Sequence, residues 1–251
     1  MEVSLPDLYP DPAADRGAQL EQQRTVARTA QFRDAHAIDP DELSDAIVVG
    51  IDQAFTADAA ISAAVAMRDG EVIETRTAEA PLRMPYVPGL LSYREGESIV
   101  EALRELDTPP DLLICDGSGR IHFRQAGIAT HVGVLFDRPA IGVAKSLLCG
   151  RPTEATDEPM PEGTTVPVQA TESVEPVATA DADWPRIGTV YQSRQYANPD
   201  HRHINPLYVS PGHRVRASSA TELVAACCAG YKLPEPTRLA DEAAEEAKGK
   251  D

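Results

Sequence analysis

The segment at residues 111–119 constrains the fold most strongly, because a run of apolar residues in it ends directly in an acid. Its sequence is DLLICDGSG. The apolar run at 112–115 is typical of a strand that is buried on both faces of a sheet. Asp116 and a glycine-rich turn follow at once, which places this carboxylate at a sheet edge that a ligand can reach. A lone carboxylate there is costly to bury without a cation or hydrogen-bond donors, and it is more commonly a loop cap. Its function therefore depends on partners elsewhere in the chain.

The length of the chain, 251 residues, is enough for one α/β domain with appendages. Its apolar runs are too short to span a bilayer, and the N-terminus lacks the basic and apolar segments of a signal peptide. The four cysteines form no C-x-x-C, and two of them are adjacent, which indicates neither a zinc cluster nor a disulfide framework. We expect a cytoplasmic monomer that contacts no membrane.

The charge balance is strongly acidic, with 40 Asp and Glu against 23 Lys and Arg and a formal net charge of −17. Such an excess ordinarily argues against binding to phosphates. Concentrated salt screens this repulsion, and acidic side chains keep a protein soluble there. Scarce lysine with retained arginine resembles the composition of halophilic archaeal proteins. The net charge therefore excludes no nucleic-acid function, and we expect folding and activity to rise toward molar KCl.

The order of the predicted elements favours a mixed α/β sheet. The sequence predicts, in order, a helix over about 15–32, strands over 46–51, 61–67 and 71–77, a rigid proline-rich loop over 81–89, a helix from Ser92 to about 106, a strand over 112–115, a helix over 125–134, strands over 140–143, 187–194 and 204–209, and a helix ending at 229. Three antiparallel strands followed by parallel ones, with helices on both faces, resemble a ribonuclease H-like sheet.

Three regions are expected along the chain. Residues 1–44 form an N-terminal extension with a helix, and residues 45–233 form the ribonuclease H-like domain. Residues 151–183 within that domain are acidic and aperiodic, which favours a surface excursion with at most a short strand near 165–168. Residues 234–251 are predicted to be a disordered acidic tail.

Three acids stand at the ends of predicted elements. Asp52 ends the first strand, Glu95 lies in the first turn of the following helix, and Asp116 ends the fourth strand. If the first and fourth strands are neighbours, Asp52 and Asp116 lie side by side and repel each other unless a divalent cation separates them. Oxygen ligands without thiolates or clustered histidines favour Mg²⁺ or Mn²⁺ over Zn²⁺. A metal site that activates water at a phosphate and three unrelated caps or solvated groups remain equal possibilities at this point.

Five segments, in order, resemble the motifs of the endonuclease V family. They are VVGIDQAF, PYVPGLLSYREG, LLICDGSGRIHFRQAGIATHVGV, GVAKSLL and SPGHRV, and the resemblance covers about residues 46–231. It implies a ribonuclease H fold and a DNA-repair endonuclease that depends on Mg²⁺, with Mn²⁺ as a substitute. The implied substrate is DNA that contains a deaminated base, chiefly deoxyinosine. The implied cut is at the second phosphodiester bond on the 3′ side of the lesion.

The resemblance also implies catalytic roles for five residues. Asp52, Glu95 and Asp116 match the metal-binding acids, Lys145 matches a phosphate-contacting lysine, and His213 matches a histidine near the metal. Without the resemblance, His213 reads as a loop histidine that follows Pro-Gly. Their chemistry agrees with phosphoryl transfer to water, which needs a metal and cations near the phosphate oxygens.

A second group of residues is implied to recognise the base. Tyr86 lies between prolines and matches a wedge that fills the gap left by a flipped-out base, although a tyrosine there can also pack into a core. The backbone expected around the base belongs to Gly89, Leu90, Leu91, Gly117, Ser118 and Gly119, where main-chain N–H groups can read acceptors. His122 matches a family position and Arg124 is expected to contact phosphate, but Phe123 stands where the family usually has proline.

Three alternatives remain open. An inosine-specific ribonuclease would use the same site, since recognition of a 2′-hydroxyl cannot be read from these motifs. A non-catalytic reader of inosine would need the base pocket without the three acids. A ribonuclease H-like domain with another substrate remains possible if Tyr86 faces the core. His131, His201 and His203 are expected to be structural or surface residues.

Overall fold

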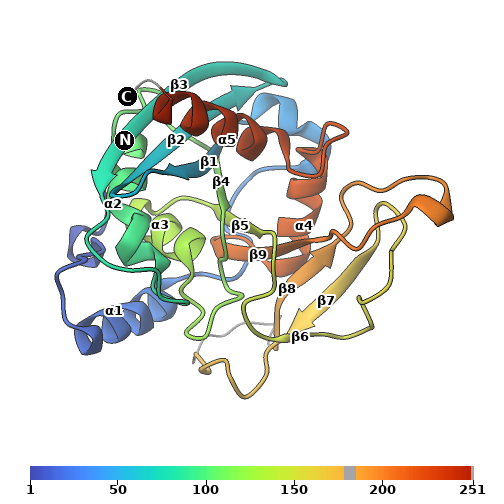
Figure 1. Cartoon of the computed structure of the whole chain (residues 1–251), viewed down its shortest axis with the longest axis horizontal. Coiled ribbons are helices and arrows are strands. Elements are labelled where there is room, and N and C mark those ends of the chain that lie inside the picture. The colour runs from blue at the N-terminus through green and yellow to red at the C-terminus, as the bar shows by residue number, and fades with distance from the viewer. Residues whose placement is uncertain (178–184, 250–251) are drawn as a thin grey trace.

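A mixed sheet of nine strands carries the fold in the computed structural model, which describes residues 1–177 and 185–249 (Figure 1). The strands are β1 (Val48–Phe55), β2 (Ala59–Arg68), β3 (Glu71–Pro81), β4 (Leu112–Asp116), β5 (Ala140–Ala144), β6 (Arg151–Pro152), β7 (Thr165–Gln169), β8 (Arg186–Tyr191) and β9 (Leu207–His213). Their order in the sheet is β3-β2-β1-β4-β5-β9-β8-β7-β6. Strands β1, β4 and β5 are parallel neighbours, and every other neighbouring pair is antiparallel. The predicted mixed sheet is confirmed.

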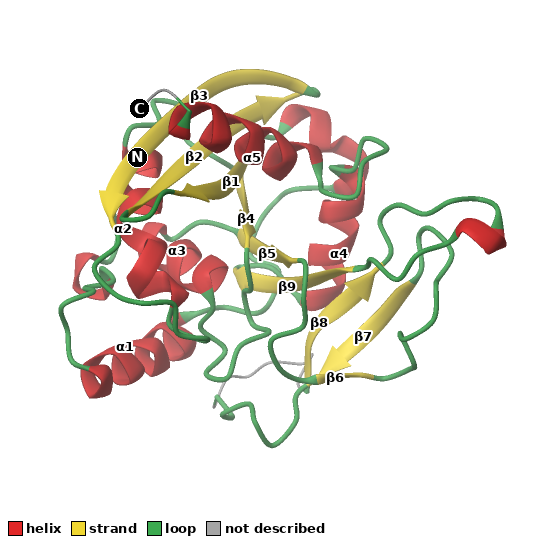
Figure 2. Ribbon diagram, in the orientation of Figure 1, coloured by secondary structure: helices red, strands yellow, loops and turns green. Residues whose placement is uncertain are grey.

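Helices cover both faces of the sheet, as Figure 2 shows. They are α1 (Arg16–Thr29), α2 (Leu91–Arg104), α3 (Ile128–Phe136), α4 (Ala217–Ala226) and α5 (Glu235–Lys248), with 3₁₀ turns η1 (Pro6–Leu8), η2 (Pro40–Asp45) and η3 (Pro199–His201). Alternate residues of the central strands enter different cores, because successive side chains of a strand point to opposite faces. Leu113 of β4 lies in the core that also holds residues of α1, α2 and α3, whereas Ile114 lies in the core that holds residues of α4.

The parallel strands fix one functional edge of the sheet. Ile51 of β1 pairs with Cys115 of β4, and Cys115 pairs with Gly142 of β5. These three strands therefore end together, at what we call the carboxyl edge. Strand β9 runs antiparallel to β5 and pairs Tyr208 with Ala144, so β9 begins at this same edge.

The predicted disordered tail is wrong for residues 235–248, which form helix α5 against β1 and β2 (Figure 1). Ala240 and Ala244 are fully buried against the side chains of these strands. A Cβ atom on Gly50 would lie 2.0 Å from the carbonyl carbon and oxygen of Pro236, so the helix start touches the strand backbone. The burying face consists of small residues, which give a weak apolar signal in a sequence. Residues 250–251 lie outside the described part of the chain.

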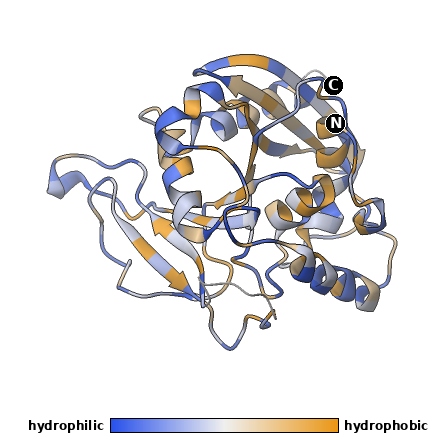
Figure 3. Ribbon diagram, turned by 180° about the vertical axis from the view of Figure 1, so that it is seen from behind, coloured by the Kyte–Doolittle hydropathy of each residue, from blue (hydrophilic) through white to orange (hydrophobic). Residues whose placement is uncertain are grey.

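The acidic segment 151–183 is more than a surface excursion. Strand β7 confirms the short strand expected near 165–168, and together with β6 it extends the sheet. This segment also buries apolar side chains against Ile187 and Val190 of β8, namely those of Met160, Val166, Val168 and Val174. Figure 3 shows hydrophobic residues along β7 and β8. The acids Asp181 and Asp183 lie outside the described residues. Among the residues that the structure describes, no helix has the length and apolarity needed to cross a membrane.

Candidate metal and base-recognition site

Asp52 and Asp116 lie side by side at the carboxyl edge. Each directly follows the paired residues Ile51 and Cys115 on neighbouring parallel strands. Asp52 is buried, and its Oδ1 accepts a 2.7 Å hydrogen bond from the Gln53 N–H. Its buried Oδ2 has no hydrogen-bond partner within the described residues. Burial and the neighbouring charge of Asp116 raise the pKa of Asp52 to about 8. A cation between the two carboxylates would offset both the burial of the Asp52 charge and its repulsion by Asp116.

Glu95 reaches the same edge from the first turns of α2. The helix is pinned to the sheet by a 2.8 Å hydrogen bond between Ser98 Oγ and Ser62 Oγ of β2. Glu95 is buried, and its Oε1 lies 3.2 Å from Arg94 Nη1. Burial raises the pKa of Glu95 to about 7, Arg94 opposes this shift, and the charge of Asp116 adds to it. All three predicted acids therefore interact electrostatically.

Lys145 follows β5 directly and completes this charged group. Its Nζ lies 2.7 Å from Asp116 Oδ2. Partial burial lowers the pKa of Lys145, but the charges of Asp116 and Asp52 outweigh it, so the net shift is upward. The lysine side chain is half exposed, which leaves it accessible from solvent.

Asp241 of α5 is an acid that the sequence reasoning missed. Its charge acts on both Asp52 and Lys145, raising the pKa of each. It follows Ala240, which is buried against β1 and β2. The signal that could have revealed it is the spacing of Pro236, Ala240 and Ala244, which marks one face of a helix.

The three carboxylates are chemically suited to a hard divalent cation, although they do not surround a single position in this structure. Among residues 1–177 and 185–249, no three His, Cys, Asp or Glu side chains form a group that could hold a metal ion in the present arrangement. The unpartnered Oδ2 of Asp52 nevertheless faces the charge of Asp116, and carboxylate oxygens are ligands that Mg²⁺ and Mn²⁺ prefer.

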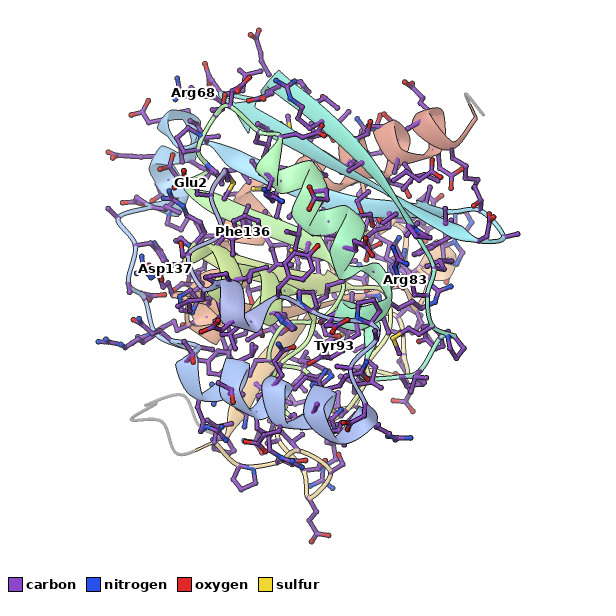
Figure 4. All side chains as sticks on the ribbon, turned by 90° about the vertical axis from the view of Figure 1, so that its left-hand side faces the viewer. Glu2, Arg68, Arg83, Tyr93, Phe136 and Asp137 are labelled. Carbon is purple, nitrogen blue, oxygen red and sulfur yellow. The ribbon has the colours of Figure 1, made fainter. Side chains whose placement is uncertain are left out.

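His213 does not belong to this group, and its predicted place near the metal is corrected. It pairs with Ala140 at the start of β5, whereas Asp116 pairs with Val143 near the end of that strand. Three residues of strand separate these positions by about 10 Å. The His213 ring is buried between Asp137, whose Oδ1 lies 3.1 Å from its Nε2, and the Gln31 N–H, which donates to its Nδ1. Figure 4 shows Asp137 on one side of the molecule and Arg83, in the proline-rich loop, on the other.

Tyr86 is 63% exposed in the loop between β3 and α2, so the alternative of a core tyrosine is wrong. This loop leaves β3 at the carboxyl edge, because Pro81 pairs with Ala59 near the end of β1. An ion pair of 3.3 Å between Arg83 and Glu97 ties the loop to α2. Its position allows the ring to reach a ligand that approaches the acids.

The carbonyl oxygen of Gly89 fixes the other end of this loop. It accepts hydrogen bonds from Gln23 Nε2 at 2.8 Å, His122 Nε2 at 3.1 Å and Arg124 Nη2 at 3.2 Å. The His122 Nδ1 accepts from the Arg124 N–H, which assigns the ring proton to Nε2. Burial lowers the pKa of His122 to about 3, so the ring is neutral. His122 and Arg124 thus position the loop, and the phosphate contact expected of Arg124 stays a prediction. Phe123 packs beside Gly89.

A small cavity lies beneath the loop. Its volume is about 30 Å³, and it is lined by Gly89, Leu91, Ser92, Ser118, His122, Gly127, Ile128 and Leu148. This volume matches one water molecule. A base can enter only if the loop or a lining side chain such as Leu148 moves.

Only part of the expected backbone lines this cavity. Gly89, Leu91 and Ser118 do. The N–H of Gly117 donates to Val143 O, and that of Gly119 donates to Ser210 Oγ, so neither is available to read a base. Leu90 is buried in the core and its N–H donates to Val87 O. The N–H groups of these three residues are thus bonded within the protein, and their contact with a base stays a prediction.

Comparison with known proteins extends the resemblance to the whole chain. The model of the family described as Endonuclease V matches residues 30–242. Endonuclease V of Natronomonas pharaonis is 52% identical over 252 residues, covering all of this chain and 98% of that protein. Endonuclease V of Halobacterium salinarum is 50% identical over 263 residues, covering 96% of this chain and 98% of that protein. The halophilic composition agrees with these relatives.

Solved structures share the fold. The crystal structure of human ENDOV has a TM-score of 0.77 at 28% identity and covers 94% of this chain and 99% of that chain. Endonuclease V of Ciona intestinalis, in complex with DNA containing an inosine followed by a ribo-adenosine, has a TM-score of 0.72 at 22% identity and covers 93% and 97%. The chain therefore belongs to the endonuclease V family, a family of metal-dependent nucleases.

Proposed function

We propose that the protein is a DNA-repair endonuclease that recognises deaminated bases, chiefly deoxyinosine, and hydrolyses the second phosphodiester bond on the 3′ side of the lesion. The observation that carries this proposal is the buried Asp52 with an unpartnered oxygen beside Asp116, in a chain of the endonuclease V family. The inosine-containing DNA bound by the Ciona intestinalis relative supports the substrate class.

Asp52, Glu95 and Asp116 are the proposed ligands of Mg²⁺, with Mn²⁺ as a substitute, and Asp241 contributes further negative charge. A cation held by these residues would supply Lewis-acid chemistry, polarising a phosphate and lowering the pKa of a water nucleophile. Lys145 compensates the charge of Asp116 at 2.7 Å and supplies a half-exposed cation that could contact a phosphate oxygen bound beside the acids. Arg94 favours the ionised form of Glu95, because its charge and its hydrogen bond lower the pKa of that carboxyl.

Base recognition belongs to the loop at 81–89 and the cavity beneath it. Tyr86 is exposed and flanked by prolines, which limits the backbone entropy lost when its ring enters a base stack. The flipped base would then lie against Gly89, Leu91 and Ser118, with Gln23, His122 and Arg124 holding the Gly89 carbonyl. A cytoplasmic monomer remains our proposal, consistent with four free cysteines.

The experiment that tests this proposal uses matched oligonucleotides with inosine or guanosine at one position, as DNA and as RNA, in molar KCl with and without Mg²⁺. We expect cutting only of the inosine DNA and only with the metal. Faster cutting of inosine RNA would favour the ribonuclease alternative. Binding without cutting would favour the non-catalytic reader. Tyr86→Ala is expected to weaken binding of inosine duplex more than the chemical step.

A further inference from the structure

The loop between β8 and β9, residues 192–206, leaves the sheet at the carboxyl edge. Its strands end and begin there, since Tyr191 pairs with Leu207 and Tyr208 pairs with Ala144 of β5. Ser193 Oγ donates a 2.5 Å hydrogen bond to the carbonyl of Lys232. The pKa of Lys232 is lowered by burial and by the charge of Lys145, which places the base of the loop near the proposed site. Figure 2 shows the loop and its 3₁₀ turn projecting away from the body.

The charge of this loop differs from that of the whole chain. It carries Arg194, Arg202, His201 and His203 with Asp200 as its one acid, in a protein of net charge −17. Arg194 is ion-paired with Glu162 at 2.9 Å. Tyr196 is 59% exposed and Ile204 is 56% exposed, so an aromatic ring and an apolar side chain accompany the cations.

Buried glutamines hold the loop in one shape. Gln195 accepts hydrogen bonds from the N–H groups of Tyr196 and His203 and donates to the carbonyls of Met160 and His203. Gln192 Nε2 donates to Asn205 Oδ1 at 2.6 Å and to Arg194 O at 2.7 Å. The Tyr196 ring meets the His203 ring edge to face at 5.5 Å. Because the loop is ordered in advance, a ligand that binds it loses little conformational entropy.

We propose that the loop at 192–206 is a second nucleic-acid contact, in which Tyr196 stacks on a base of the strand that flanks the lesion and Arg202 faces its phosphates. This proposal rests on the proposed function, which brings DNA to the carboxyl edge. An exposed ring beside arginine and histidine is the combination that binds single strands by stacking. Stacking also suits concentrated salt, where phosphate contacts are screened.

The test measures the affinity of Tyr196→Ala and Arg202→Ala for fluorescent inosine DNA in molar KCl, with a long substrate and versions that lack the 5′ or the 3′ flank. We expect Tyr196→Ala to weaken binding of the long DNA by about 5- to 100-fold. For the DNA that lacks the contacted flank, we expect Tyr196→Ala and the wild type to bind with equal affinity. We expect Tyr196→Phe to bind the long DNA as the wild type does. Arg68→Ala is the matched control, because Arg68 ends β2 on the side away from the carboxyl edge. Figure 4 shows it far from Arg83, which lies in the loop at that edge.

The proposal is overturned if both variants bind all substrates as wild type does, or if they lose affinity equally for all of them with unchanged melting temperatures. If the wild type binds long inosine DNA through the loop but cuts nothing, the proposed function fails while the loop proposal stands.

Discussion

The Gln23 Nε2 donates a 2.8 Å hydrogen bond to the carbonyl oxygen of Gly89, and this bond joins helix α1 to the loop that presents Tyr86. The orientation of the Gln23 amide is set by Arg124, whose Nε donates to Gln23 Oε1 at 2.6 Å. The N–H groups of Gln23 and Arg124 therefore converge on one backbone oxygen. The N-terminal extension thus takes part in positioning the loop at 81–89.

Replacing Gln23 by leucine should weaken the binding of inosine DNA by about tenfold, because a buried carbonyl loses a donor and Arg124 loses its acceptor. The dissociation constants for inosine and guanosine duplexes measure this effect. The control is Gln22→Leu, since Gln22 donates to Asp7 O and Tyr9 O and does not contact the loop. Equal affinity of both variants for inosine duplex would contradict the positioning role.

Replacing Lys145 by methionine should lower the cleavage rate by about 10²- to 10³-fold, because the cation that compensates Asp116 and faces the phosphate is lost. Single-turnover rates at saturating substrate measure the effect, and Lys145→Arg should recover part of the rate. Lys248→Met is the matched control, since Lys248 pairs only with Glu245 on α5 among the contacts described. Unchanged rates in Lys145→Met would remove this residue from the site.

Replacing Gly50 by alanine should destabilise the fold by about 1–3 kcal/mol or more, since the new Cβ would lie 2.0 Å from backbone atoms of Pro236. The clash pushes α5 away from β1, and with it Asp241. Chemical denaturation measures the free energy of unfolding. Gly249→Ala is the control, because its Cβ would meet only ordinary contacts, the nearest at 3.7 Å. Equal stability of the two variants would show that α5 does not pack on β1.

The buried His131 should make the protein less stable in acid. Burial lowers its pKa from 6.5 to about 4. Its Nε2 bonds to Leu8 O at 2.7 Å, and its buried Nδ1 has no partner within the described residues, so a second ring proton would have no acceptor. Because the folded pKa lies below the unfolded value, the unfolded chain takes up the proton first. The stabilising contribution is therefore lost as the pH falls from about 6.5 toward 4, by about 3 kcal/mol in all.

His131→Gln tests this pH dependence, because glutamine can still donate to Leu8 O and does not titrate. The free energy of unfolding, measured at several pH values between 4 and 7, should fall less steeply with acid in this variant. His122 contributes in the same direction, since burial lowers its pKa also. An identical slope in the variant and the wild type would show that His131 is not a buried neutral group.

Sequence patterns predicted the centre of the sheet well and its periphery poorly. The apolar runs before Asp116 and in β1 and β2 follow from burial on both faces of the sheet, which a local pattern records. Helix α5 was missed because its contacts are made by alanines and by the close approach of Gly50 and Pro236, which are properties of the packed structure. The helix predicted from Ser92 begins one residue earlier, at Leu91, with Leu90 at the cap position.

The site was predictable where its residues sit at strand ends. Asp52 and Asp116 could be placed together because parallel strands bring their ends to one edge. His213 was misplaced because a Ser-Pro-Gly-His sequence does not reveal the direction of β9, which carries His213 toward the opposite end of β5. The hydrogen bond from Gln23 to Gly89 joins residues that are 66 positions apart, and no local pattern records such a contact.

The central claim is that the acids at the carboxyl edge, without His213, carry out metal-assisted cleavage. The most direct measurement compares the cleavage rates of Asp52→Asn and His213→Gln on inosine DNA with Mg²⁺, with melting temperatures confirming that both variants fold. We predict a loss of at least about 10³-fold in Asp52→Asn and a rate within a few-fold of wild type in His213→Gln. Wild-type cleavage by Asp52→Asn, or a loss in His213→Gln as large as that of the acid variant, would contradict the account.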